Sequence, residues 1–81
     1  MNDPRRKQIK EAYKMIQSAV SILETVCDDE QDAFDNMPES LQQTDNAITQ
    51  EDNLIELAET KDNIEYELTR LEEIVPTVAT N

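Results

Sequence analysis

The 81-residue chain contains no glycine, histidine or tryptophan, and it has a single cysteine. Without glycine, the tight hairpin turns that need a positive φ are hard to build, which disfavours a small all-β fold. One cysteine cannot form an internal disulfide, and without histidine the chain lacks the ligands of a typical zinc site. The composition therefore favours an all-α fold with neither a disulfide framework nor a zinc finger.

Long apolar runs are also missing, because no run of apolar residues exceeds two. The sequence therefore predicts neither a transmembrane helix nor a signal peptide. With 37% hydrophobic residues and three aromatic residues, the core must be small. We expect a soluble, cytoplasmic protein with one domain over residues 1–81 and without a roomy enzyme cleft.

Basic residues are few and unevenly placed. Seven Lys and Arg stand against 19 Asp and Glu, a formal net charge of −12. Residues 1–14 hold five basic and two acidic residues, a net of +3, whereas residues 15–60 hold 12 acidic residues and no basic one. A chain this acidic is repelled by nucleic acid and by anionic lipid. The distribution predicts a partner protein with a basic surface, and neither direct nucleic-acid binding nor membrane binding. One form of this interpretation is mimicry of nucleic acid, in which the carboxylates stand where the partner binds phosphates.

A first helix is predicted over residues 4–34. Asn2 is a typical N-cap, and Pro4 suits the first helical turn. Apolar residues then recur at spacings of three and four, which places them on one stripe of a helix. This stripe comprises Ile9, Tyr13, Ile16, Val20, Leu23 and Cys27. Ala12, Ala19, Val26 and Ala33 follow beside it every seven residues and form a flank that a second helix can approach closely.

A second helix is predicted over residues 49–75. Thr49 followed by Glu51 and Asp52 has the form of a capping box. A coiled-coil seam then consists of Leu54, Leu57, Lys61, Ile64, Leu68, Leu71 and Val75. Residues 35–48 become the linker, with a single helical turn in it, and residues 76–81 a frayed tail.

Two long helices with a short linker should pair as an antiparallel, coiled-coil-like hairpin. This arrangement lays the basic start of the first helix beside residues 61–81, which hold two basic and five acidic residues, a net of −3. Because a lone hairpin leaves much of each apolar stripe exposed, we expect it to assemble into a homodimeric four-helix bundle.

The segment around the linker combines carboxylates with an aromatic residue, a methionine and a leucine. Such a mixture suits a partner-binding surface in which apolar anchors are surrounded by charge. The candidate partner-binding residues are Asp28, Asp29, Glu30, Asp32, Phe34, Asp35, Met37, Glu39 and Leu41. Two plainer interpretations stay open: the acidic residues keep the protein soluble, and the apolar ones close the end of the hairpin.

The basic residues near the start of the chain suggest a different ligand. Arg5, Arg6 and Lys10, with Tyr13, are candidates for holding the phosphates of a small nucleotide signal, which predicts a small oligomeric sponge as the alternative function. In a structural role, the same cations would instead pair with Glu65, Glu72 and Glu73 of the second helix.

A catalytic role has less support. Glu56, Glu59, Asp62 and Glu65 have the spacing with which helical nucleotide pyrophosphohydrolases hold magnesium, but the first helix has no matching Glu-x-x-Glu. The acidic run from Asp28 to Asp32 lacks the glycine and the distal glutamate of a calcium-binding EF-hand loop. Cys27 continues the apolar stripe and has no histidine as a base. We therefore expect a non-catalytic protein without a cofactor or a metal site.

Residues 28–42, with the sequence DDEQDAFDNMPESLQ, carry a resemblance. Placed between a helix with a basic start and an acidic helix, they resemble small uncharacterised proteins of bacteriophages and integrated mobile elements, over residues 5–75. Related proteins continue the linker with a stretch that contains glycine and arginine, where this chain has Thr44-Asp45-Asn46-Ala47. That family has no assigned catalytic residues. The resemblance implies a phage setting, in which small acidic proteins often inhibit host defence proteins or host enzymes.

Overall fold

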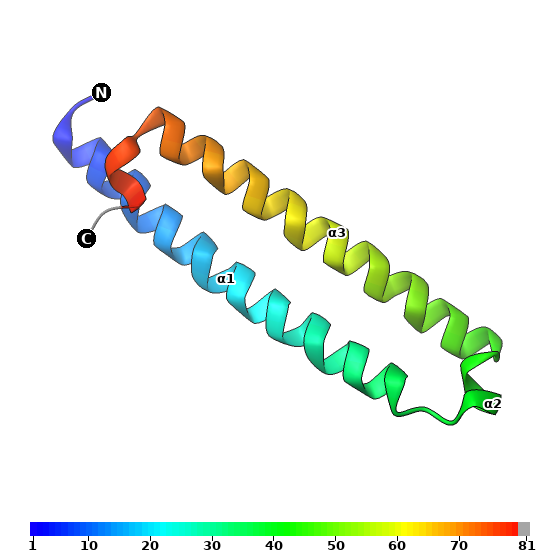
Figure 1. The fold of residues 1–81 in the computed structure, drawn as a ribbon. Coiled ribbons are helices and arrows are strands. Elements are labelled where there is room, and N and C mark those ends of the chain that lie inside the picture. Colours follow the sequence, from blue (N-terminus) through cyan, green and yellow to red (C-terminus); the bar gives the residue numbers. More distant parts are fainter. Residues whose placement is uncertain (80–81) are drawn as a thin grey trace.

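The computed structural model describes residues 1–79 and has no strand among them. Two long helices, α1 (Asp3–Asp35) and α3 (Asp45–Ile74), lie side by side and run in opposite directions (Figure 1). A four-residue helix, α2 (Glu39–Gln42), lies in the linker, and a 3₁₀ helix, η1 (Pro76–Ala79), follows α3. The rod measures 59 × 17 × 13 Å. The predicted all-helical hairpin is therefore confirmed.

The ends of α1 follow from local chemistry. The backbone N–H of Arg5 donates to the Asn2 side-chain oxygen over 3.0 Å, and Pro4 occupies the first turn, where its missing N–H costs nothing. The helix extends one residue beyond the predicted range at each end. It stops at Asp35, three residues before Pro38, because a proline disfavours helical geometry in the residue that precedes it.

The start of α3 differs from the prediction. The helix begins at Asp45, four residues before Thr49, because Thr44 acts as its N-cap. The Thr44 hydroxyl accepts a hydrogen bond from the backbone N–H of Ala47 over 3.3 Å and donates to the carbonyl of Leu41 over 2.7 Å. Asp45 adds a negative charge to the first turn, which the helix dipole favours. Thr49 is consequently an exposed residue inside the helix, and the linker spans only residues 36–44.

The last residues also differ from the prediction. Val75 and Val78 are buried, and η1 carries Val78 back against α1 and α3. Residues 76–79 are therefore folded, contrary to the predicted frayed tail, because the two valines give this turn an apolar face to bury. Residues 80–81 of that predicted tail lie outside the described residues.

The core lies at the end of the rod that carries the termini. Its buried cluster consists of Tyr13, Leu68, Val75 and Val78, and the half-buried Ile9, Ile16 and Leu71 pack against it. Towards the linker, the seam residues Leu23, Cys27, Leu54 and Leu57 are only half-buried. Apolar burial, the main source of stability, is thus concentrated at the terminal end.

Replacing Thr44 by alanine should lower the free energy of unfolding by about 1 kcal/mol, since the first turn of α3 loses its cap. Thr49→Ala is the matched control, because it makes the same chemical change inside the helix and should be close to neutral. Urea unfolding followed by circular dichroism measures both variants. Equal destabilisation by the two changes, or a larger effect at Thr49, would contradict this start of α3.

Candidate functional site

The nine predicted partner-binding residues gather at the linker end of the rod, on the last turns of α1, the linker and α2. The acidic members are all exposed, and Leu41 is 50% exposed. Phe34 and Met37 are half-buried. On α1 the acids at successive positions point in different directions around the helix axis. The structure therefore brings the nine residues to one end of the molecule as a charged surface.

The linker is tied to the end of α1 by one side chain. The Gln42 amide nitrogen donates to the Met37 carbonyl over 2.9 Å and to the Phe34 carbonyl over 3.3 Å. Together with the partial burial of Phe34 and Met37, these bonds favour the interpretation that those two residues help to close the hairpin. Leu41 is left as the most exposed apolar side chain of the predicted set.

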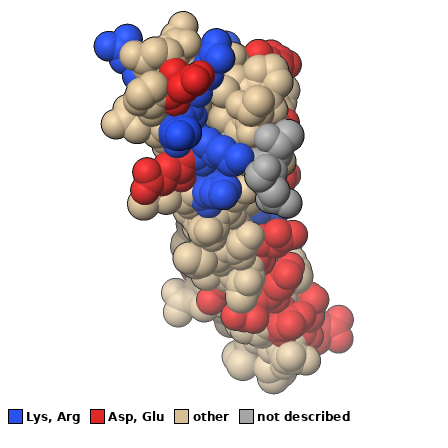
Figure 2. Space-filling view, turned by 90° about the vertical axis from the view of Figure 1, so that its left-hand side faces the viewer, with Lys and Arg blue, Asp and Glu red and all other residues tan. Residues whose placement is uncertain are grey.

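The charge is divided along the rod. Figure 2 shows the Lys and Arg side chains gathered towards the end with the termini, with some Asp and Glu among them, whereas towards the other end only Asp and Glu are seen, mainly along one side of this face. Residues 15–60, with their 12 carboxylates and no cation, include the linker and the adjoining halves of α1 and α3. The fold therefore keeps the separation of charge that the sequence carries.

The basic residues are arranged differently from the prediction. Arg6, Lys7 and Lys10 line a groove of about 290 Å³ together with Asp3 and Thr77. Arg5 and Tyr13 do not belong to this groove, so the four predicted ligands do not form one site. Lys7, the third residue of the basic run Arg5-Arg6-Lys7, lies in this groove, because positions 3, 7 and 10 are spaced three and four apart and so share one helix face. Thr77 was missed because the end of the chain was expected to fray.

The expected ion pairs between the basic start of α1 and α3 are absent. Within residues 1–79 four ion pairs form, and each joins residues of one helix: Arg6–Asp3, Lys61–Asp62, Lys61–Glu65 and Arg70–Glu67. A neutral donor links the helices at this end instead. The Tyr13 hydroxyl donates to the Glu72 carboxylate over 2.6 Å, and the Gln17 side-chain amide donates to the Tyr13 oxygen over 3.3 Å.

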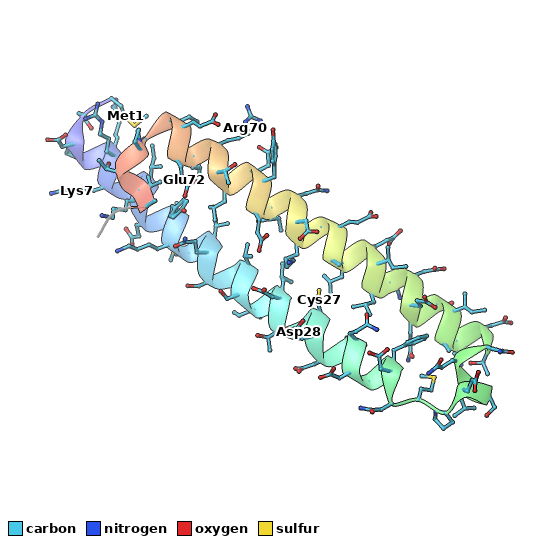
Figure 3. The ribbon with its side chains drawn as sticks, viewed as in Figure 1. Met1, Lys7, Cys27, Asp28, Arg70 and Glu72 are labelled. Carbon is cyan, nitrogen blue, oxygen red and sulfur yellow. The ribbon has the colours of Figure 1, made fainter. Side chains whose placement is uncertain are left out.

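This contact changes the acidity of the phenol. Donation to Glu72 raises the pKa of Tyr13 above its usual 10.0, and burial and the negative charge of Glu72 act in the same direction. The two residues line a polar groove of about 740 Å³ that also includes Lys14, Glu24 and Glu65. Figure 3 places Glu72 on the last turns of α3, beside the start of α1.

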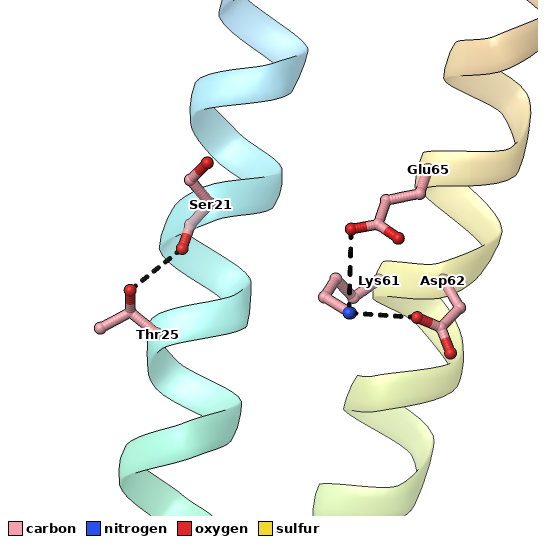
Figure 4. A network of polar contacts seen from close by, with 5 residues as sticks. All are labelled: Ser21, Thr25, Lys61, Asp62 and Glu65. Carbon is pink, nitrogen blue, oxygen red and sulfur yellow. Dashed lines mark hydrogen bonds and ion pairs between the residues drawn. The ribbon is translucent and has the colours of Figure 1, made fainter.

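Lys61 occupies the apolar seam, where its side chain keeps only 16% of its surface exposed. Its ammonium group contacts Asp62 at 3.1 Å and Glu65 at 3.8 Å, both on its own helix (Figure 4). The hydrogen bond to Asp62 raises the pKa of Lys61, and the charges of Asp62, Glu65 and Glu24 add to this, although burial acts against it. Across the seam, Glu24 of α1 acts on Lys61 only through its negative charge, and within residues 1–79 neither Glu24 nor Glu30 forms an ion pair with it.

The acidic pattern of α3 does not form a metal centre. The described residues contain no group of three or more His, Cys, Asp or Glu side chains arranged to hold a metal ion. Of the four carboxylates with the spacing of a pyrophosphohydrolase helix, those of Asp62 and Glu65 contact Lys61. Cys27 lies half-buried between α1 and α3 (Figure 3), consistent with its place on the apolar stripe.

No helix within residues 1–79 is long and apolar enough to cross a membrane. Comparison with protein-family models, curated proteins and solved structures finds no significant match to this chain.

The raised pKa of Tyr13 predicts a pH dependence of stability. Because the folded state holds the phenol proton more tightly than the unfolded state, this contribution is fully present below about pH 10 and is lost as the pH rises through the folded pKa. Thermal unfolding at increasing pH should show this loss in the wild type and in Tyr66→Phe, but not in Tyr13→Phe. A loss that is unchanged in Tyr13→Phe would contradict the assignment.

Proposed function

We propose that the protein is a non-catalytic binding protein whose acidic linker half docks on a basic surface of another protein. One observation carries the proposal: residues 15–60 contain 12 carboxylates and no cation, and the hairpin folds them into one half of a rod. A solvated surface needs only an excess of acids. Lys and Arg are absent from all 46 positions of residues 15–60, which favours the interpretation that this segment has been selected to carry negative charge only.

The physical advantage of such a surface is electrostatic steering. Complementary charge accelerates the encounter with a basic protein and disfavours partners of the wrong charge. The acids at the linker end have no cation beside them, since the described ion pairs lie at residues 3–6 and 61–70. Their field is therefore available to a partner, and binding should weaken as salt screens it.

The apolar contribution comes from the linker. Leu41 is half exposed among Glu39 and the carboxylates at the end of α1, which supplies an apolar anchor inside a charged rim. Together with the resemblance of residues 28–42 to phage proteins, this favours an inhibitor of a host or defence protein in the host cytoplasm. Exposed carboxylates spread along a helical rod also favour a partner whose basic surface binds the phosphates of nucleic acid.

Self-association is part of the same proposal. Only six residues among positions 1–79 are buried apolar residues, and several large apolar side chains are exposed. A hairpin with so little buried area gains stability by covering its remaining apolar surface with another chain. We therefore propose that the protein acts as a homodimer.

Neutralising the acidic end should weaken the capture of a basic partner. The triple variant Asp32→Asn, Asp35→Asn and Glu39→Gln removes three exposed charges and should weaken binding by about tenfold or more. The readout is the dissociation constant for a protein captured from bacterial lysate, identified by mass spectrometry and then purified.

The matched control neutralises three exposed acids at the other end, by Asp3→Asn, Glu11→Gln and Glu73→Gln, with the same change in net charge. The control variant should bind the partner as tightly as the wild type does. Added salt or duplex DNA should release the partner from the wild-type protein. An equal loss of binding in both variants would show that only the net charge of the protein matters and would contradict docking through the linker end. Unchanged binding by the first variant would overturn the proposal.

A second candidate function follows from the groove lined by Arg6, Lys7 and Lys10. Three cations converging on one small groove favour a phosphate group as ligand, as the nucleotide-sponge interpretation requires.

Adenosine diphosphate is a suitable probe of this groove. Calorimetry should detect binding to the wild type, and Lys7→Ala with Lys10→Ala should remove it. Lys14→Ala is the control, because Lys14 lines the polar groove of Tyr13 and Glu72 instead. Absence of binding to the wild type, or equal loss in the control, would exclude this function.

A further inference from the structure

The two broad faces of the hairpin differ in chemistry. One face holds the polar groove with Lys14, Gln17, Glu24, Glu65 and Glu72. The opposite face of α1 carries a row of small apolar residues, Ala12, Ala19, Val26 and Ala33, all exposed. The sequence predicts that a second helix approaches this row, yet α3 does not cover it. The row is therefore a helix-packing surface without a helix on it in the single chain.

Two grooves lie along this face between the long helices. The first, about 460 Å³, has an apolar floor of Ile16, Ile64, Leu68 and Leu71 and is bordered by Thr60, Asn63 and Glu67. The second, about 270 Å³, lies nearer the linker between Val26 and Glu30 of α1 and four residues of α3, Gln50, Asn53, Leu54 and Leu57. Charge is scarce in both: one carboxylate lines each groove, and that of Glu67 is paired with Arg70.

Larger apolar side chains border the same surface. Met15 and Ile22 are 67% and 64% exposed, and their spacing with Ala12, Ala19 and Val26 alternates between three and four, which places all five on one side of α1. Ile74, 64% exposed, lies seven residues after Glu67 and so continues the border of the groove on α3. An apolar surface of this length on a small protein marks an interaction site.

The exposed area is of the size that a dimer buries. The chain has a solvent-accessible surface of 6220 Å², whereas a compact monomer of 9.3 kDa is expected to have about 5,000 Å², a difference of about 1,200 Å². A standard interface removes about 800 Å² from each partner. Covering one long face of the hairpin therefore brings the chain to the exposure of an ordinary folded protein.

We propose that this face binds a second copy of the chain in the antiparallel orientation, with α1 packed on α1 of the second copy around a twofold axis at Ala19. The inference rests on the self-association proposed above and specifies its surface and orientation. In this register Ala12 lies opposite Val26 of the other copy and Ala19 lies opposite itself. Small residues at the crossing let the two helices approach closely.

Charge selects the antiparallel orientation. It sets residues 1–14 of one copy, with a net charge of +3, at the level of residues 24–37 of the other, which hold six acidic residues and no basic one. The parallel orientation places the two acidic ends, each with 12 carboxylates over residues 15–60, side by side. Like charges at close range are destabilising, and the basic ends would repel one another as well.

The first test is the mass in solution. Light scattering should give twice the 9.3 kDa chain mass for the wild type and the monomer mass for Ala19→Glu, which sets two carboxylates against each other on the twofold axis. Ser18→Glu adds the same charge at the neighbouring exposed position, which lies away from this face, and should stay dimeric. A monomeric wild type, or dimeric Ala19→Glu, would overturn the inference.

Cross-linking separates the two orientations. In a Cys27→Ala background, Ala19→Cys should form a disulfide-linked dimer under mild oxidation, because the two copies of position 19 meet at the axis. Ala33→Cys should not, because antiparallel packing sends the two copies of position 33 to opposite ends of the dimer. Equal cross-linking at both positions would indicate the parallel orientation. The acidic triple variant should stay dimeric by light scattering, because apolar contacts hold the dimer, so a loss of docking in a variant that is still dimeric separates the two proposals.

Discussion

The apolar contact between Tyr13 of α1 and Leu68, Val75 and Val78 of the returning chain holds this hairpin shut. It is the one buried cluster in the described residues, and it lies at the end of the rod that carries the termini. η1 depends on it, because Val78 supplies the surface that turns the chain back after Pro76. The Tyr13–Glu72 hydrogen bond depends on it too, since packing holds the phenol against α3 over 2.6 Å.

The buried core and the densest negative charge consequently lie at opposite ends of the rod. The terminal end holds the buried cluster and the basic groove, whereas the linker half has a half-buried seam and a dense carboxylate surface. Closely spaced acids repel one another and add little to stability, so their density points to a use outside the chain. The sparsely charged face beside Ala19 lies between these ends, and the proposed pairing of two rods in opposite directions would set each well-packed end beside the less well-packed end of the other.

Periodicity and capping residues predicted the hairpin well, because an apolar stripe with spacings of three and four has one geometric meaning. The start of α3 was misplaced because Thr44 and Thr49 are both followed by acidic residues, so that either could be the N-cap. Thr44 is the N-cap in the fold, which places Ala47 in the first turn of α3, where it is buried; this tertiary contact is not visible in the local sequence. The tail was misjudged for a similar reason, since the single valine that follows Pro76 carries no helical pattern. The prediction for the basic cluster was right in part. The charge pattern located the cluster at the end of the rod with the termini, but the groove also includes Thr77, which belongs to the tail that was expected to fray.

The central claim is that stability is concentrated at the terminal end and declines towards the acidic linker. Native-state hydrogen exchange, read residue by residue, measures this directly. The account predicts that amides around Tyr13–Val20 and Ile64–Leu71 exchange slowest, by at least about tenfold relative to those of residues 28–35 and 45–55. Uniform protection along both helices, or slowest exchange beside the linker, would contradict it.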